Sequence, residues 1–157
     1  MGSRWFFIND RCAIFSGRNV PKGLYFLLKT QLTMKRVFVS FAIEDRFARD
    51  NIVHQAQRQS APFSFVDMSV KDPWDSQWKT KCRERIRGCD GLIAFVSNNT
   101  VSADGARWEI QCAYEEGIPV LPLYIHDSGA SRLPSELSGK KIYHWTWDNV
   151  TNFIDGL

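Results

Sequence analysis

One glutamate lies where the surrounding residues favour catalysis. Glu109 belongs to the stretch Gly91–Val120, in which a short apolar run is followed by a polar loop, a helical pattern and a second apolar run. This order predicts a βαβ crossover whose first loop opens at the carboxyl end of a strand, where open α/β sheets bind ligands. A carboxylate there can hold substrate hydroxyl groups and stabilise a developing positive charge. Glu109 is therefore the candidate catalytic residue.

Glu109 also has a purely structural interpretation. It falls early in the predicted helix, where a carboxylate interacts favourably with the helix dipole, by about 0.3–1 kcal/mol. Residue type and position alone do not separate this interpretation from the catalytic one.

The other candidate site residues lie mostly at the carboxyl ends of predicted strands. They are polar or aromatic, so they could line a ligand-binding mouth at this edge of the sheet. The predicted substrate-binding residues are Ser40, Phe41, Asp45, Asp67, Ser69, Trp74, Trp78, Ser97, Asn98, Trp108 and His126. Four of them have simpler alternatives: Asp45 could cap a helix, Trp74 and Trp78 could belong to the core, and His126 could be an ordinary surface histidine.

The elements that position these residues alternate along the chain. The predicted strands are Val37–Phe41, Phe63–Asp67, Leu92–Val96, Val120–Ile125 and Ile142–Trp145, and the predicted helices include Glu44–Gln57, Pro73–Arg87 and one carrying Ile110, Ala113 and Tyr114. Ser102 or Asp104 is expected to cap this last helix, Gly117 to end it, and Asp148 to cap a final helix. Five strands alternating with helices predict one α/β domain, doubly wound, with a parallel sheet covered on both faces.

Within the first predicted helix, three apolar residues are expected to contact the core. They are Phe47, Ile52 and Val53. Lys79, Arg83 and Arg87 form a basic row in the second helix, which fits a solvated face better than a phosphate clamp.

Composition narrows the class of protein. The chain has 157 residues with 44% hydrophobic and 24% charged residues, typical of one globular domain. No apolar run approaches the ~20 residues that span a membrane. Four cysteines without metal-ligand spacing fit reduced thiols in a cytoplasmic protein, and no metal site is expected.

The first 33 residues differ from the rest. They carry five basic residues and one acidic residue, so the net charge of +3 leaves −1 for residues 34–157. A domain without a basic excess makes a nucleic-acid partner unlikely on charge grounds. Residues 1–33 are expected to be an N-terminal extension, left by cloning or from upstream sequence, with the domain spanning 34–157.

Common nucleotide-binding and signalling motifs are absent. The sequence has neither GxGxxG nor GxxxxGK[ST], which excludes a Rossmann fingerprint and a P-loop. A response regulator needs an acidic cluster after the first strand and an aspartate closing the third strand, and Ala42 and Ser97 stand there.

Three segments resemble the TIR-like domain of Thoeris-type bacterial anti-phage systems. They are VFVSFAIEDRFARD, FSFVDMSVKDPWDSQWKTKCRERIRGCDGLIAFVS and SADGARWEIQCAYEEGIPVLPLYI, which together extend over roughly Met34–Asp127. The motifs are a Ser-Phe strand end, a D-x-S-x-K-x-P segment (Asp67–Pro73) and a W-E-I helix start (Trp108–Ile110). The resemblance implies a flavodoxin-like, TIR-like fold.

The resemblance also implies an activity. In that family the glutamate matching Glu109 cleaves NAD, and the cyclic or conjugated ADP-ribose product activates an effector protein. NAD is then the substrate, with no further cofactor and no membrane partner, and the protein could form homo-oligomers. Many TIR domains have a tryptophan four residues before this glutamate, whereas this chain has Gly105 there and Trp108 beside the glutamate. This difference leaves the assignment of Glu109 unchanged, but the resemblance then does not fix which ADP-ribose product is made.

Two other functions remain open. Asp104–Ile110, with Ala113 and the Gly117–Val120 stretch, also resembles the glutamate helix of nucleoside deoxyribosyltransferases, although Gln111-Cys112 replaces their usual Gly-Tyr pair. The third possibility is a non-catalytic TIR-like module that only assembles with partners.

Overall fold

The computed structural model describes residues 4–8, 11–15, 34–61, 63–66 and 77–157. The chain divides into two compact units, Met1–Met34 and Lys35–Leu157. In the first unit, β1 (Arg4–Ile8) and β2 (Arg11–Phe15) form an antiparallel pair in which Arg4 is opposite Phe15. The predicted site residues belong to the second unit. Those in 67–76 lie outside the described residues.

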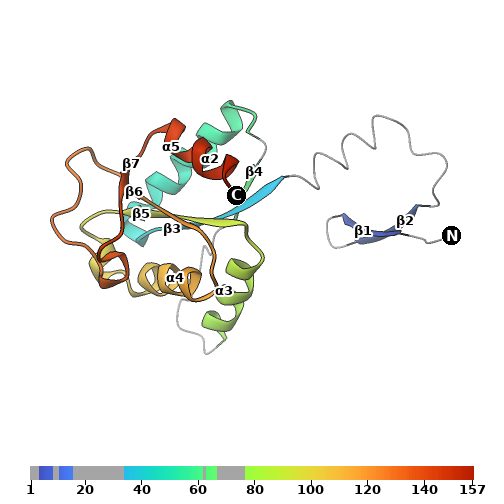
Figure 1. Ribbon diagram of the computed structural model, residues 1–157, viewed down its shortest axis with the longest axis horizontal. Helices are drawn as coiled ribbons and strands as arrows, with labels where there is room; N and C mark the ends of the chain where they lie inside the picture. Colours follow the sequence, from blue (N-terminus) through green and yellow to red (C-terminus); the bar gives the residue numbers. More distant parts are fainter. Residues whose placement is uncertain (1–3, 9–10, 16–33, 62, 67–76) are drawn as a thin grey trace. The chain divides into compact units, whose positions relative to one another are not determined.

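The second unit is built on a five-stranded parallel sheet (Figure 1). Its strands are β3 (Lys35–Ser40), β4 (Phe63–Val66), β5 (Gly91–Val96), β6 (Val120–Tyr124) and β7 (Tyr143–His144). Their spatial order is β4-β3-β5-β6-β7, the order of flavodoxin-like folds. The predicted α/β, doubly wound class is therefore confirmed, and β3 and β5 lie side by side in the interior of the sheet.

Helices cover both faces of this sheet. α2 (Arg46–Arg58) and α5 (Trp147–Asp155) lie on one face, and α3 (Trp78–Arg87) and α4 (Asp104–Glu115) lie on the other (Figure 1). Short 3-10 helices precede α2 (η1, Ile43–Asp45) and α4 (η2, Thr100–Ser102), and a third lies at Ser135–Leu137 (η3). No helix of the described chain is long and apolar enough to cross a bilayer.

Alternation along the strands produces two cores. Val37 and Val39 of β3 pack with Ile52 of α2 on one face, whereas Phe38 packs with Ile110 of α4 on the other. All six residues of β5 are buried, as expected for a strand covered on both sides. Because Ser40 follows Phe38 by two residues, it faces the α3–α4 side of the sheet.

Several local predictions need correction. Phe47 is 47% exposed instead of buried, because the first helical turn begins with η1 and places Phe47 away from the sheet, while Ile52 is fully buried as expected. Neither Ser102 nor Asp104 caps α4: Ala103 holds that position, and no side chain bonds the free N–H groups. The last helix is capped by Thr146, which accepts from the Asn149 N–H, instead of by Asp148.

The end of α4 agrees with the prediction. Gly117 has φ +69°, which a residue without a Cβ adopts at little cost, so the chain turns there from α4 toward β6. The predicted start of the second helix at Pro73 lies outside the described residues, and the described helix begins at Trp78.

A chain beginning at Met34 is expected to melt within about 2 °C of the full chain, since both described cores are made by residues between Val37 and Leu157. Thermal unfolding followed by circular dichroism measures this. A fall of several degrees would mean instead that residues 1–33 bury apolar surface on the domain, each Å² contributing roughly 25 cal/mol.

Candidate active site

The buried carboxylate of Glu109 is the centre of the site. Its residue is only 7% exposed, although it lies on a helix near the carboxyl ends of β3 and β5. The Ser40 hydroxyl donates a hydrogen bond to Glu109 Oε2 at 2.7 Å, and Cys82 Sγ lies 3.9 Å from Oε1. A buried carboxylate held by specific donors is positioned before a substrate arrives, as electrostatic catalysis requires.

The periodicity of α4 explains how a glutamate reaches this position. Ala106, Ile110 and Ala113 are buried, and Glu109 shares their side of the helix at the spacings i+3 and i+4. Ser40 Oγ also lies 3.3 Å from the Ala106 carbonyl oxygen, one turn before Glu109. Burying a charge is costly unless it is hydrogen-bonded, so the carboxylate at this place argues for a role beyond helix stability.

Two tryptophans form an aromatic wall beside Glu109. The Trp78 ring is buried on α3, with its centroid 5.2 Å from that of Trp108 on α4. Lys79 Nζ and the Arg83 guanidinium lie 5.9 and 5.6 Å from the Trp108 centroid. Trp78 is thus a core residue, as its alternative interpretation predicted, and Trp108 is the partly exposed ring of the pair.

The second buried carboxylate lies across the sheet from Glu109. Asp45 is 2% exposed, accepting from Ser97 Oγ at 2.5 Å and from Asn99 Nδ2 at 2.9 Å. Ser97 Oγ in turn accepts from the Asn99 N–H, and Thr100 Oγ1 accepts from the Ser97 N–H, both at 2.9 Å. These bonds tie the start of α2 to the loop that leads into α4. Asp45 stands at the N-cap position of α2, but its side chain bonds this loop and makes no capping bond.

The remaining candidates are spread along the same edge. Phe41 is half-buried and packs on the α2–α5 core. Asn98 is exposed and accepts two bonds from Ser131, from its N–H at 2.8 Å and its hydroxyl at 2.9 Å. His126 is exposed, with its ring centroid 6.2 Å from that of Phe47. Ser40 and Glu109 are in direct contact, whereas Asn98 binds Ser131 and the ring of His126 lies beside that of Phe47.

Three predicted residues remain untested. Asp67, Ser69 and Trp74 lie outside the described residues, so their roles stay predictions.

Sequence reasoning missed Cys82, which contacts Glu109. The signal was the spacing of Trp78, Cys82 and Ile86, whose side chains share one buried face of α3. Burial, followed by the charge of Glu109, raises the pKa of the Cys82 thiol well above its usual range, and burial raises that of Cys89 to about 11. At neutral pH Cys82 is therefore a neutral S–H donor toward Glu109, without nucleophilic thiolate character. The three described cysteines on this domain are free thiols.

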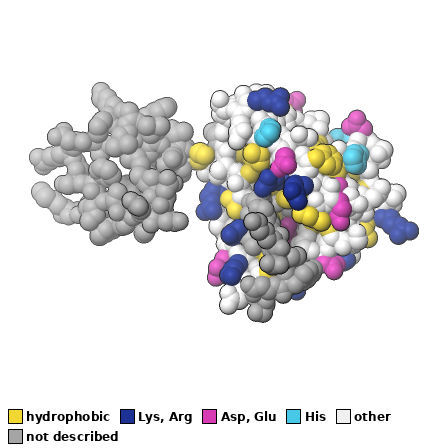
Figure 2. All heavy atoms as spheres, turned by 180° about the vertical axis from the view of Figure 1, so that it is seen from behind, with side chains coloured by type: hydrophobic (Ala, Val, Ile, Leu, Met, Phe, Trp, Pro, Cys, Tyr) yellow, Lys and Arg dark blue, Asp and Glu magenta, His cyan; other side chains and the backbone are white. Residues whose placement is uncertain are grey.

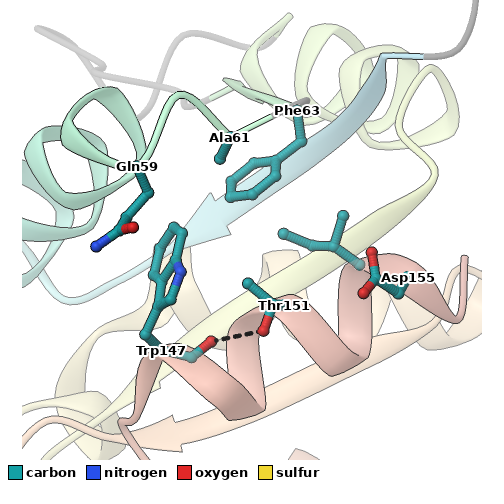
Figure 3. A pocket seen from close by; sticks show the side chains of 7 residues that line it. Gln59, Ala61, Phe63, Trp147, Thr151 and Asp155 are labelled. Carbon is teal, nitrogen blue, oxygen red and sulfur yellow. Dashed lines mark hydrogen bonds between the residues drawn. The ribbon is translucent and has the colours of Figure 1, made fainter.

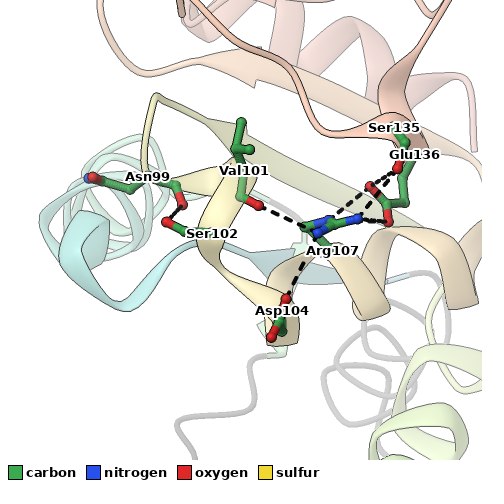
Figure 4. A network of polar contacts seen from close by, with 7 residues as sticks. All are labelled: Asn99, Val101, Ser102, Asp104, Arg107, Ser135 and Glu136. Atoms are coloured by element: carbon green, nitrogen blue, oxygen red, sulfur yellow. Dashed lines mark hydrogen bonds and ion pairs between the residues drawn. The ribbon is translucent and has the colours of Figure 1, made fainter.

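An ion pair holds the first turn of α4 (Figure 4). The Arg107 guanidinium binds Glu136 of η3 at 3.0 Å and lies 3.8 Å from Asp104. Burial opposes ionisation of Glu136, but the hydrogen bonds from Arg107 outweigh it and lower the pKa of Glu136. The turn carrying Trp108 and Glu109 is thereby joined to the loop that follows β6.

A second set of ion pairs joins α3 to α4. Arg83 binds Glu115 at 2.8 Å and Glu116 at 2.6 Å, and Arg87 binds Glu116 at 2.6 Å. The basic row Lys79, Arg83 and Arg87 thus lies on a solvated face as expected, with Arg83 and Arg87 also paired to glutamates of α4 and its C-cap. On the face of the molecule in Figure 2, basic and acidic side chains are interspersed over the described residues.

The hollow shown in Figure 3 lies away from this site. It measures about 170 Å³ and opens between Phe63, at the amino end of β4, and Trp147, Thr151 and Asp155 of α5. Thr151 Oγ1 donates to the Trp147 carbonyl oxygen there at 3.1 Å, so this hydroxyl already has an acceptor. Among the described residues, no three His, Cys, Asp or Glu side chains are grouped to hold a metal ion.

Comparison with known protein families decides the affiliation. The family described as Thoeris protein ThsB, TIR-like domain, matches residues 38–130, which is more than half of the chain and includes Ser40, Asp45 and Glu109. The chain belongs to this family. It is a TIR-like protein of Thoeris defence, as the three resembling segments predicted.

One solved structure agrees with the fold. A 2-deoxyribosyltransferase from Bacillus psychrosaccharolyticus superposes with a TM-score of 0.52 at 15% identity, over 74% of this chain and 90% of that one. A prokaryotic SEFIR domain gives a TM-score of 0.44 at 9% identity, over 78% and 88% of the two chains. At these identities the likeness concerns the fold alone. No curated protein matches the sequence significantly.

Proposed function

We propose that this TIR-like protein cleaves NAD at the nicotinamide–ribose bond and that Glu109 is its catalytic residue. The observation that carries the proposal is the buried Glu109 carboxylate, oriented by Ser40 at 2.7 Å near the carboxyl end of β3. Membership of the Thoeris TIR-like family supports the choice of substrate.

The bond that breaks explains why one carboxylate suffices. The leaving nicotinamide is a pyridinium cation, so the electron pair of the C–N bond neutralises it and no general acid is needed. The ribose becomes oxocarbenium-like at C1′, and the Glu109 carboxylate stabilises that charge, whereas ordinary glycosidases need two carboxylates. Water attacking C1′ gives ADP-ribose and a proton, and a nucleophile on the ADP-ribose itself gives a cyclic product.

Other residues of the site have supporting roles in this proposal. Ser40 orients the carboxylate, and the exposed part of Trp108 offers a ring on which nicotinamide can stack. Asp45 and Ser97 hold the loop before α4 in place. The product, a cyclic or conjugated ADP-ribose, would then activate a partner effector protein.

One experiment separates this function from its alternatives. The purified full chain is incubated with NAD and, separately, with deoxynucleosides and a free base, and the products are resolved by chromatography. Release of nicotinamide supports the proposal. Base exchange between deoxynucleosides would instead identify a deoxyribosyltransferase, whose glutamate is a nucleophile. No turnover of either substrate would favour a non-catalytic assembly module.

NAD cleavage is expected to depend on self-association, because a loop of a neighbouring protomer would complete the NAD pocket around Glu109. Specific activity per protomer should then rise with protein concentration, because assembly populates the competent state. The loop predicted to complete the NAD pocket of the neighbouring protomer is Asp67–Asp75, which carries Trp74. This loop lies outside the described residues. Mixing Trp74→Ala with Glu109→Gln should restore part of the activity. Constant specific activity over a hundredfold dilution, without complementation, contradicts this prediction.

A further inference from the structure

Three exposed apolar or aromatic side chains follow the carboxyl ends of β3 and β6. Ile43 of η1 is 63% exposed and Phe47 of α2 is 47% exposed. The Phe47 ring lies 6.2 Å from that of exposed His126, which follows β6, at an interplanar angle of 34°. We call Ile43, Phe47 and His126 the aromatic platform. The sequence pattern predicted that Phe47 contacts the core. Since the ring is exposed instead, packing does not explain why an aromatic residue stands at this position.

The platform lies on the same edge of the sheet as Glu109. Ser40, which holds Glu109, ends β3, and His126 follows the end of β6, with β5 between these two strands. Strands are about 4.8 Å apart, so β3 and β6 are separated by about 10 Å. Between them lies the bond from Ser97, which follows β5, to Asp45, two residues before Phe47. Phe47 therefore lies two residues from the hydrogen bond that joins the start of α2 to the loop leading into α4.

The chemistry of the platform fits a planar nucleobase. A phenyl ring and an imidazole ring at this tilt provide a stacking surface, and the imidazole adds a polar group at its rim. The patch consists of three side chains, whereas a stable protein interface needs about 800 Å² and 20–30 residues from each partner. A small aromatic ligand therefore matches the platform better than a second copy of the chain.

We propose that the aromatic platform binds the second base of the dinucleotide substrate, the adenine of NAD, while Glu109 engages the ribose beside nicotinamide. This inference rests on the proposed function for the identity of the substrate. The two ribose-phosphate units between the bases give a dinucleotide the length to reach from β3 to β6. Phe47 thereby favours NAD over nicotinamide mononucleotide, which lacks the adenine.

Binding measurements on the full chain test the platform directly. The probes are AMP, which carries only the adenine half, and nicotinamide mononucleotide, which carries only the reacting half; both are titrated by NMR. Phe47→Ala is expected to weaken AMP binding about tenfold or more, the usual effect of losing one base–aromatic stack. It should leave binding of the mononucleotide unchanged. Phe47→Trp, which keeps a ring, should retain AMP binding, and Phe47→Leu, which keeps only apolar volume, should not.

The matched control is Met34→Ala. Met34 is similarly exposed, at 38%, but precedes β3 at the opposite edge of the sheet, so this variant should bind AMP as the native chain does. With NAD as substrate, Phe47→Ala should raise KM about tenfold and leave kcat unchanged, because stacking on the distal base is made equally in the ground and transition states.

The results separate failure of the platform from failure of the proposed function. If AMP binding depends on Phe47 but the native chain does not cleave NAD, the platform stands as an adenine site and the proposed function is wrong. If NAD is cleaved but Phe47→Ala changes neither AMP binding nor KM, the platform inference is overturned. It is also overturned if Phe47→Ala leaves AMP binding intact and abolishes dimerisation in sedimentation, which would assign the patch to a second copy.

Discussion

Replacing Glu109 with glutamine is expected to lower the rate of NAD cleavage by about a hundred- to a thousandfold. Glutamine keeps the shape of the side chain and can still accept a hydrogen bond from Ser40, but it carries no negative charge. Loss of a positioned electrostatic group costs about 3–4 kcal/mol in the transition state. The melting temperature should not fall, because the amide avoids the cost of burying a charge.

The measurement is release of nicotinamide, followed by chromatography, together with thermal unfolding of each variant. Glu84→Gln is the matched control: Glu84 is an exposed glutamate on the neighbouring helix α3, so its loss should leave both rate and stability unchanged. A folded Glu109→Gln protein with native turnover would remove Glu109 from the mechanism. It would leave the position of the buried carboxylate without a catalytic explanation.

Replacing Asp45 with alanine is expected to destabilise the protein by about 2–3 kcal/mol, which corresponds to a melting temperature roughly 10 °C lower. Asp45 is buried and accepts from Ser97 Oγ and Asn99 Nδ2. Alanine leaves both donors without this acceptor and removes the link between α2 and the loop before α4. Because this loop precedes the catalytic helix, NAD cleavage should fall at temperatures where the variant is still folded.

Chemical denaturation and calorimetry give the stability change. Asp50→Ala is the matched control on α2: Asp50 is half-exposed, and its 2.6 Å bond to neighbouring Arg49 is of a kind that contributes little in water. Asp45→Asn should lose less stability than Asp45→Ala, since the amide oxygen accepts one of the two bonds. Equal stabilities for Asp45→Ala and Asp50→Ala would show that the buried network is not what holds the loop.

The amino-acid sequence was sufficient for much of the fold. The central strands β3, β5 and β6 were recognisable as short apolar runs, because the interior strands of a parallel sheet are buried on both faces. Helix ends were less predictable. Ala103 and Thr146 are the N-caps where Ser102 or Asp104, and Asp148, were expected. Several neighbouring polar residues can each serve as a cap, and the choice depends on how the preceding loop approaches the helix.

Phe47 shows a different limit. Its apolar side chain suggested a core contact, but the 3-10 turn Ile43–Asp45 sets where α2 begins. That turn is anchored by Asp45 to Ser97, a residue 52 positions later in the chain. An interaction between such distant residues leaves no local periodicity, so the exposure of Phe47 could not be deduced from its neighbours in sequence.

The sequence by itself determined the α/β class and the position of Glu109 on a helix after a buried strand. It also determined the resemblance to the Thoeris TIR-like family, and the match to that family over residues 38–130 confirms it. These rest on local patterns of apolar and polar residues, which persist in any conformation of the chain. Only the tertiary structure decided which side chains meet Glu109. Ser40 and Cys82 are 69 and 27 residues away from it in sequence, and the pairing of β3 with β5 and the packing of α3 on α4 bring them within contact.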